Sequence, residues 1–190
     1  MFAHITNHIK RFVSLTAEEE KLLCSYLRIE KYNKKEHLLE MGDLCTGRYF
    51  INSGVLRMYT LNEKGVEQVI HFAIEGWWIT DYFTYKTNIP SKSNIQAVEV
   101  AEVVVVDATV QDELLEKIPQ LEKYFRLVLE KAYAASLMRT HYMFNFSAEE
   151  RYRHFISAYP DFVQRVPQYL LASYLGFTPE FLSKMRAKKE

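Results

Sequence analysis

The chain has 190 residues, with 24 basic and 24 acidic side chains, so its formal net charge is zero. This length allows one large domain or two modest ones with a full hydrophobic core. Zero net charge excludes a general attraction of the whole protein to nucleic acid, so DNA binding would need a local basic surface. The two cysteines, Cys24 and Cys45, form no C-x-x-C pair and are too few for an iron–sulfur cluster held by one chain.

The beginning of the chain does not resemble a signal peptide, because histidines, lysine and arginine interrupt its apolar residues. No uncharged apolar stretch of about 18 residues follows, which is the minimum for a transmembrane helix. We therefore expect a soluble, cytoplasmic protein.

The first part of the chain, residues 1–28, is predicted to be helical, with Thr16 capping a helix that has an acidic first turn. From about residue 29 to residue 108 the pattern changes to short segments rich in β-branched and aromatic residues, separated by glycines. Segments 55–61 and 66–72 flank a turn and predict a β-hairpin, while 102–107 is apolar enough to be buried on both faces. Many short strands at close spacing indicate an antiparallel barrel or jelly roll.

A short helix at 111–116 is followed by Pro119, which can open a longer helix that reaches about residue 146. Apolar residues follow a four-three spacing along this helix, which is typical of a coiled-coil seam. We expect this seam to form a dimer interface: Leu121, Phe125, Val128, Ala132, Ala135 and Tyr142. A second apolar flank could pack against the strands of the same chain: Leu129, Tyr133, Leu137 and Phe144. Ser147 and Glu150 form a capping box that starts a further helix at 148–158.

The last stretch of the chain predicts two short helices around a tight turn. The first helix spans Gln168 to Leu175 and ends at Gly176, because glycine adopts a left-handed conformation without steric cost. Thr178 is a good N-cap for the second helix, and Pro179 suits its first position. This arrangement favours a helix-turn-helix that reads DNA, and the alternative is an ordinary helical hairpin. The residues expected to face DNA are Gln168, Thr178, Glu180, Ser183, Lys184, Arg186 and Lys188.

The order of these elements resembles the cyclic-AMP-receptor and fumarate-nitrate-regulator (Crp/Fnr) family of bacterial transcription factors. The segments Glu40–Asp43, Asn52–Arg57, Gly65–Glu67 and Glu75–Gly76 match the turn pattern of that family in order. The resemblance implies an α+β fold: a cyclic-nucleotide-binding-like β jelly roll at 1–118, a long dimerisation helix at 119–146, and a helix-turn-helix domain at 147–190. It also implies a homodimer that binds DNA, with RNA polymerase and a small-molecule effector as further partners.

Residue by residue, Glu180 and Lys184 match the base-reading acidic and basic positions of the family's recognition helix. A glutamate can accept a hydrogen bond from cytosine, and a lysine can donate to guanine. Pro179 stands where the family often has arginine, so the target sequence cannot be transferred. The sequence ends at Glu190, where the family normally adds a two-stranded wing, so we expect a wingless DNA-binding domain with fewer phosphate contacts.

The expected ligand pocket departs further from the family. Its nucleotide-binding segment, here called the cassette, has a glycine-glutamate pair for the ribose and then an arginine beside serine or threonine for the phosphate. Here two tryptophans follow the glycine and would fill or reshape the pocket, and the later segment carries lysine as its only cation. Lysine lacks the two-pronged donor that suits a phosphate. The residues at issue are Gly76, Trp77, Trp78, Ser91, Lys92 and Ser93. This pattern disfavours a cyclic nucleotide, and we expect no cofactor.

Neither a metal site nor an enzyme is indicated, since His37, His71 and Asp81 lack a local ligand spacing. The favoured hypothesis is a homodimeric DNA-binding transcription regulator whose jelly roll senses an unidentified signal. The alternative is a small-molecule sensor or interaction module with a vestigial DNA-binding domain.

Overall fold

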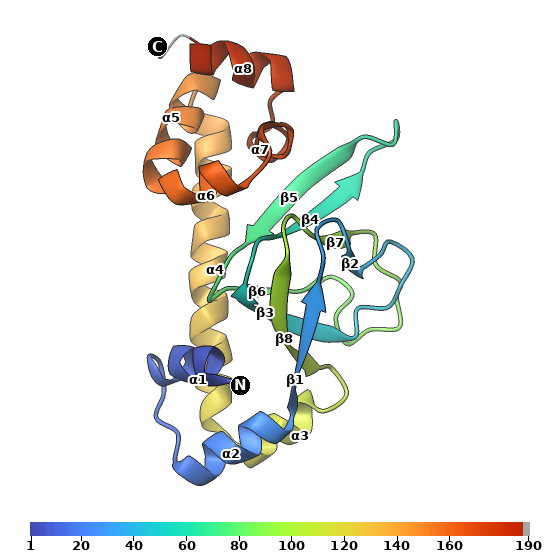
Figure 1. Ribbon diagram of the computed structural model, residues 1–190, viewed down its shortest axis with the longest axis vertical. Coiled ribbons are helices and arrows are strands. Elements are labelled where there is room, and N and C mark those ends of the chain that lie inside the picture. Colours follow the sequence, from blue (N-terminus) through green and yellow to red (C-terminus); the bar gives the residue numbers. More distant parts are fainter. Residues whose placement is uncertain (188–190) are drawn as a thin grey trace.

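In the computed structural model, residues 1–187 are described, and they form a two-sheet β-domain beside a long helix that carries the C-terminal helices at one end (Figure 1). Both sheets are antiparallel and four-stranded. The first has the order β1 (Leu27–Tyr32), β8 (Ala101–Asp107), β3 (Gly47–Ser53) and β6 (Trp78–Ile79). The second has the order β2 (His37–Leu39), β7 (Asn94–Ala97), β4 (Leu56–Leu61) and β5 (Glu67–Ala73). We call these two sheets the roll, and the predicted α+β class with a jelly roll is confirmed.

The predicted hairpin is β4–β5, with Leu61 opposite Glu67 at its closed end. The Asn62 side chain sets the turn, because its Oδ1 accepts hydrogen bonds from the backbone N–H groups of Lys64 and Val66, both at 3.0 Å. Side chains of asparagine commonly stabilise turns in this way. Among residues 1–187, β5 has no strand partner on its other side, so it forms an edge of the second sheet.

β8 is buried on both faces, as its four consecutive valines predict. Val103 and Val105 lie in the core between the sheets, whereas Val104 and Val106 lie on the outer face of the first sheet. Each is at most 1% exposed. Because side chains alternate along a strand, one run of valines contributes to two separate cores.

The helices cover the outer face of the first sheet and then continue away from it. They are α1 (Ala3–Lys10), α2 (Ala17–Ser25), α3 (Gln111–Lys117), α4 (Gln120–Asn145), α5 (Ala148–Ala158), α6 (Pro160–Arg165), α7 (Gln168–Leu175) and α8 (Pro179–Ala187). The capping boxes predicted at Thr16 and Ser147 are both present. Residues 1–28 are less helical than predicted, because the chain turns after α2 and Leu27 already pairs with Val106 in the first sheet. Within the described residues, none of these helices combines the length and the apolar character needed to cross a bilayer.

α4 is anchored to the roll by the apolar residues of its first turns. Leu121, Tyr124 and Phe125 are buried in the second core, together with Phe50 and Val104 of the first sheet. This corrects the predicted dimer seam at Leu121 and Phe125, since these two side chains are used inside the subunit. The second apolar flank of α4 was predicted to pack against the strands, but it lies on the surface. Its four residues are all exposed: Leu129, Tyr133, Leu137 and Phe144. We call these four residues the α4 stripe.

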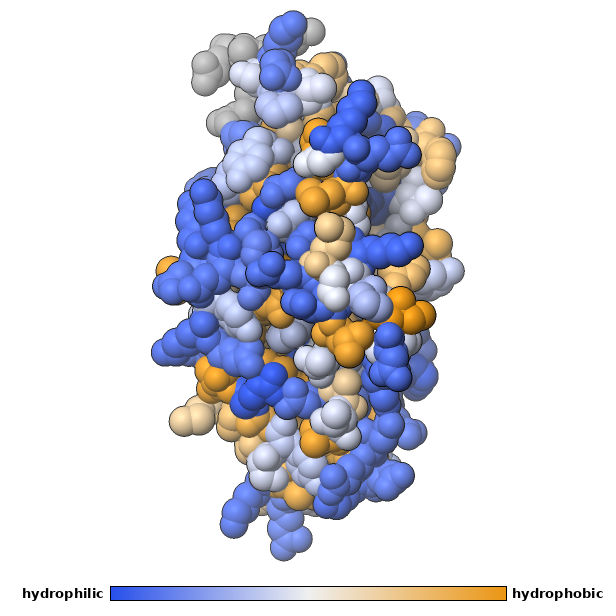
Figure 2. All heavy atoms as spheres, turned by 90° about the vertical axis from the view of Figure 1, so that its right-hand side faces the viewer, coloured by the Kyte–Doolittle hydropathy of each residue, from blue (hydrophilic) through white to orange (hydrophobic). Residues whose placement is uncertain are grey.

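The surface of the roll itself is mainly polar on the side turned away from α4. Figure 2 looks onto that side and shows hydrophilic side chains over most of it, with separate hydrophobic patches between them. The α4 stripe is a different kind of surface, because three of its residues follow one another at four-residue spacing and so share one helix face.

The Tyr124 hydroxyl joins α4 to two other elements and should matter for stability. It accepts a hydrogen bond from Trp78 Nε1 at 2.7 Å and lies 2.9 Å from His8 Nδ1. Tyr124→Phe should lower the free energy of unfolding by about 1–3 kcal/mol, because the Trp78 N–H is left without an acceptor. Tyr159→Phe, at an exposed tyrosine between α5 and α6, is the control and should change it by less than about 0.5 kcal/mol. Urea denaturation of both variants measures the difference, and equal stabilities would show that the hydroxyl has no such role.

Candidate DNA-binding surface and sensor domain

The turn between α7 and α8 has the geometry that its sequence predicts. Gly176 adopts the left-handed conformation with φ +76°, and Phe177 N–H donates to the Ala172 carbonyl at 2.8 Å. Thr178 Oγ1 then accepts from the Phe181 N–H at 3.2 Å and caps α8. These contacts satisfy backbone groups that would otherwise be unpaired where one helix ends and the next begins.

α7 and α8 pack through a small apolar core with α5. Leu171, Ala172 and Leu182 are almost completely buried there, with Tyr152 of α5 beside them. Ala172 has only a methyl group, which allows the two helices to approach closely. Leu182 and, in part, Met185 point inward, so the opposite face of α8 is turned outward. Figure 1 places this helix at the end of the molecule away from the sheets. The two helices therefore form a helix-turn-helix arrangement.

The outer face of α8 carries most of the residues predicted to face DNA. Glu180, Ser183 and Lys184 are exposed together, and Thr178 is exposed at the start of the helix. Hydrogen bonds from its own backbone N–H and from Thr178 lower the pKa of the Glu180 carboxyl, so it stays ionised. The side chain of Arg186 and the whole of Lys188 lie outside the described residues.

Gln168 differs from this group. Its side chain is half-buried at the start of α7, and its Oε1 atom is buried without a hydrogen-bond partner among the described residues. A buried acceptor of this kind is rare in a folded protein. Gln168 stays a predicted DNA contact, but its side chain is not freely presented in this structure.

The two tryptophans do not fill the interior of the roll, and that part of the prediction is wrong. Gly76 forms a turn with φ +80°, and Trp77 lies partly exposed over His71, with ring centres 6.4 Å apart. Trp78 points to the outer face of the first sheet, where its ring lies 5.4 Å from that of Phe125. The alternation of β6 explains this, because Ile79 is the residue that points between the sheets.

Asp81 lies beside the serines of the cassette and binds one of them, a contact that we did not predict from the sequence. Its carboxylate is 2% exposed and accepts hydrogen bonds from Ser91 Oγ at 2.7 Å, Thr84 Oγ1 at 2.8 Å and the Phe83 N–H at 3.1 Å. Ser91 Oγ also accepts from the Ser93 N–H, at 3.0 Å. The serine hydroxyl that could bind a phosphate is thus already paired with a negative charge. The Asp-x-x-Thr spacing was the available signal, because aspartate often bonds to residues that follow it.

The other residues of the cassette point in opposite directions. Lys92 is exposed, whereas Ser91 and Ser93 are buried. The space between the sheets is filled by apolar side chains, among them Tyr49, Ile51 and Met58. The described residues contain no cluster of three or more histidine, cysteine or acidic side chains that could hold a metal.

A direct contact joins the helix-turn-helix to the edge strand of the roll. Ser173 of α7 accepts a hydrogen bond from the Val69 N–H at 2.9 Å and donates to the Glu67 carbonyl at 3.0 Å. Gln68 Nε2 in turn donates to the Ser173 carbonyl at 2.7 Å. Val69 and Phe72 of the roll share an apolar cluster with residues of α6 and α7. The two parts of the chain are therefore packed as one unit on this side.

Arg139 of α4 completes this junction. It donates to the carbonyls of Ile70 in β5 and Tyr174 in α7, and its guanidinium lies 4.0 Å from the centre of the Tyr174 ring. Burial, with the nearby Arg139 charge, lowers the pKa of His71 to about 4, so that histidine stays neutral at pH 7. One arginine thus ties the long helix, the edge strand and α7 together.

Arg165 forms the second polar junction, between α6 and two turns of the roll. Its Nη1 and Nη2 donate to the two oxygens of Glu75 at 2.9 and 2.7 Å, and it also bonds to Glu99. Glu75 accepts a further hydrogen bond from the Gly54 N–H. The Arg165 hydrogen bonds hold the pKa of Glu75 down to about 2. The stabilisation from this pair is therefore present above pH 4.5 and is lost as the pH falls toward 2.

Arg165→Gln should lower the free energy of unfolding by about 1–2 kcal/mol, since solvent screens a pair that is about a third exposed. It should also increase amide hydrogen exchange in α6 and α7, because those helices lose a contact to the roll. Arg153→Gln is the control, as Arg153 pairs with Glu149 on the exposed face of α5 and makes no contact with the roll among the described residues. Identical exchange in the two variants would contradict a role of Arg165 in docking.

Comparison with known proteins agrees with this architecture. Residues 29–117 match the cyclic nucleotide-binding domain family. The chain is 26% identical over 169 residues to an anaerobic regulatory protein of Aggregatibacter actinomycetemcomitans, covering 83% of this chain and 65% of that protein. It is also 26% identical to a fumarate and nitrate reduction regulatory protein of Yersinia pestis, covering 83% and 67% of the two chains. The chain spans 61–65% of the length of the first three curated relatives.

Solved structures show the same fold. A putative transcriptional regulator of the Crp/Fnr family from Eubacterium rectale superposes with a TM-score of 0.71 at 16% identity, covering 92% of this chain and 83% of that one. The c-di-GMP-responsive global regulator CLP of Xanthomonas campestris gives 0.73 at 12% identity, covering 91% of both chains. Residues 29–117 therefore form a cyclic nucleotide-binding domain, and the chain is a homologue of bacterial anaerobic and fumarate–nitrate regulatory proteins.

Proposed function

We propose that this protein is a homodimeric DNA-binding transcription regulator in which α8 enters the major groove. The observation that carries the proposal is the outer face of α8, where Glu180, Ser183 and Lys184 are exposed while Leu182 is buried beneath them. A helix kept only for packing has no need of a capped, polar outer face. Side chains of these types can bond to base edges in the major groove.

The α4 stripe supports the dimer. Regulators of the helix-turn-helix type read two half-sites about 34–36 Å apart, so they need two recognition helices held by one symmetric interface. Apolar side chains exposed along one face of a long helix suit such an interface. The dimer face therefore shifts from the predicted seam to the stripe. Ala132 and Ala135 are exposed, but Ala135 lies on the side of α4 opposite the stripe. Val128 and Tyr142, which are half-buried, are less suited to it.

The cassette supports a signal other than cyclic AMP. A cyclic phosphate would meet the Asp81 carboxylate and a serine hydroxyl that already pairs with it. Arg57, a buried cation of the second sheet, is paired with Glu67 and Gln96. Like charges at close range disfavour binding. We infer that the roll transmits its state through α4 and through the junctions at Arg139 and Arg165.

The dimer face is tested by placing a charge on the stripe. Leu137→Glu should convert the protein to a monomer, because two carboxylates would be buried without partners in the interface. Met138→Glu, the next residue, points about 100° away around α4 and should leave the dimer intact. Sedimentation velocity at micromolar concentration measures both. If Ala135→Glu gives monomers and Leu137→Glu does not, the interface follows the seam predicted from the sequence.

DNA reading is tested on an operator selected from a random DNA pool. Lys184→Ala should weaken binding by about 1–3 kcal/mol and relax the preference at one base pair, because a base-edge contact is lost. Lys123→Ala, an exposed lysine at the other end of α4, should leave affinity unchanged. Fluorescence anisotropy at fixed salt measures both variants. If neither lysine matters to the affinity, α8 does not face DNA, and the function is that of a sensor or interaction module.

A further inference from the structure

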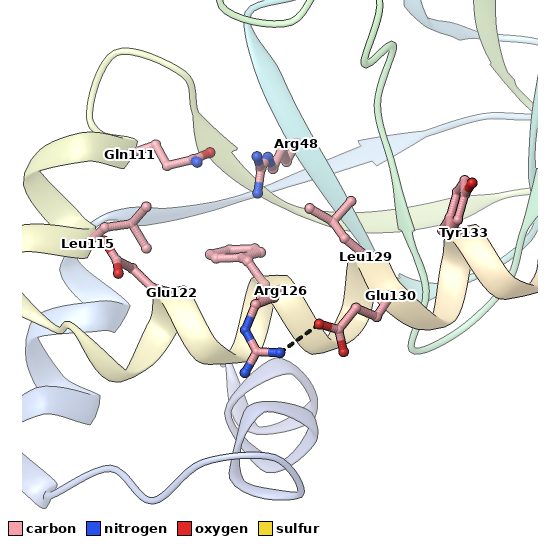
Figure 3. Close-up of a pocket in the computed structure, with 9 residues that line it drawn as sticks. Arg48, Gln111, Leu115, Glu122, Arg126, Leu129, Glu130 and Tyr133 are labelled. Atoms are coloured by element: carbon pink, nitrogen blue, oxygen red, sulfur yellow. Dashed lines mark hydrogen bonds and ion pairs between the residues drawn. The ribbon is translucent and has the colours of Figure 1, made fainter.

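An open groove of about 510 Å³ lies between the outer face of the first sheet, α3 and α4 (Figure 3). Arg48 of β3 and Gln111 of α3 lie on one side of it, and Leu115, Phe125 and Leu129 form apolar walls. It is separate from the interior of the roll, because Tyr49, the neighbour of Arg48 in β3, points inward between the sheets. We propose that this groove binds a small organic monocarboxylate whose charged group pairs with Arg48.

Arg48 is a buried cation to which residues 1–187 supply no counter-charge. Its side chain is 8% exposed, and its Nε and Nη1 atoms have no hydrogen-bond partner within the described part of the chain. Arg57 gives the direct comparison, since it is 4% exposed and pairs with Glu67 at 2.6 Å and with Gln96. Burial of an unpaired charge is strongly unfavourable, so buried arginines normally have an anionic partner.

The surroundings of Arg48 hold its guanidinium in place without neutralising it. The rings of Tyr85 and Phe125 both lie 4.8 Å from its central carbon, and that of Tyr82 lies 5.5 Å away. Aromatic faces attract a cation, and the Tyr85 hydroxyl can accept one N–H of the guanidinium, but neither supplies a negative charge. Figure 3 shows the amide of Gln111 reaching toward Arg48. The Gln111 oxygen accepts from the Tyr85 hydroxyl, so its amide nitrogen is a further donor for an anion.

The charges around the groove select a single negative charge. Arg126 at the rim is already paired with Glu130 at 2.6 Å, and Glu122 is exposed beside them. Arg48 is thus the cation that stays unpaired, and the rim carboxylates repel a second negative charge on the ligand. The guanidinium fork matches a carboxylate, the apolar walls suit a hydrocarbon body, and the volume lies within the range of small-molecule sites.

The site can be tested on the wild-type full chain with benzoate, and with benzamide as its uncharged counterpart. Calorimetry should show saturable binding of benzoate that is at least about tenfold tighter than that of benzamide, because only the carboxylate forms the charged pair. Inorganic phosphate, with its higher charge, should bind more weakly than benzoate. Equal binding of benzoate and benzamide, or no benzoate binding up to about 10 mM, a concentration above the weak affinities of small ligands, overturns the proposal.

Variants locate the site within the groove. Arg48→Gln should weaken benzoate binding at least about tenfold, whereas Arg126→Gln, which removes the paired arginine of the rim, should change it less than about twofold. Equal effects of the two substitutions overturn the assignment to Arg48. Folding gives an independent readout, because Arg48→Met should not lower the melting temperature of the ligand-free protein, while Arg57→Met should lower it. A loss for Arg48→Met as large as for Arg57→Met shows that Arg48 is satisfied within the protein and overturns the proposal.

The proposed dimer allows one further discrimination. If a carboxylate of the partner subunit fills the groove, benzoate binds the Leu137→Glu monomer but not the wild-type dimer, and the small-ligand proposal is overturned. Binding to both forms supports it. Since none of these measurements involves DNA, the groove can be established or rejected whether or not α8 reads an operator.

Discussion

The arrangement of this protein depends on the burial of β8 on both faces. One face of the strand contributes Val103 and Val105 to the space between the sheets, and the other offers Val104 and Val106 to the helices. The outer face must be covered, because exposed valines would cost hydrophobic free energy, and the first turns of α4 cover it. Once Leu121 and Phe125 are used there, the remaining apolar face of α4 is turned to solvent. The position of the stripe therefore follows from the composition of one strand.

The parts of the fold that could be predicted from the sequence are those that depend on local chemistry. The turn at Gly176, the caps at Thr16 and Ser147, and the β4–β5 hairpin are each fixed by residues within a few positions. Which face of α4 packs on the roll could not be predicted in this way. Four-three spacing identifies the apolar faces of a helix but does not indicate which partner covers each of them. The choice between the two flanks is made by tertiary packing, which periodicity does not contain.

The roll shows a second limit of the same kind. Whether Trp78 or Ile79 points between the sheets depends on a register of one residue in a very short strand. Arg48 was missed because nothing in the sequence around it marks a charged residue as buried. Asp81 was considered only as a metal ligand, although its Asp-x-x-Thr spacing indicated a local hydrogen bond. The structure assigns the two opposite charges to different sides of the first sheet, where Asp81 is saturated by hydroxyl and backbone donors and Arg48 is surrounded by aromatic rings. Burying two opposite charges that do not pair with each other is costly. Asp81 offsets this cost with hydrogen bonds inside the protein and so has a structural role, whereas Arg48 has no such anionic partner and is the charge we assign to a ligand.

The docking of α7 on β5 has a consequence for solubility. β5 is the edge of its sheet, and an open edge offers a row of backbone groups to which the strand of another chain can pair. Here Ser173 occupies the Val69 N–H and the Glu67 carbonyl, and Arg139 occupies the Ile70 carbonyl, so the edge is covered by side chains from two helices. Any rearrangement that lifts α7 from the roll to meet DNA would uncover this edge. α7 thus covers a sheet edge that would otherwise be open to pairing with another chain.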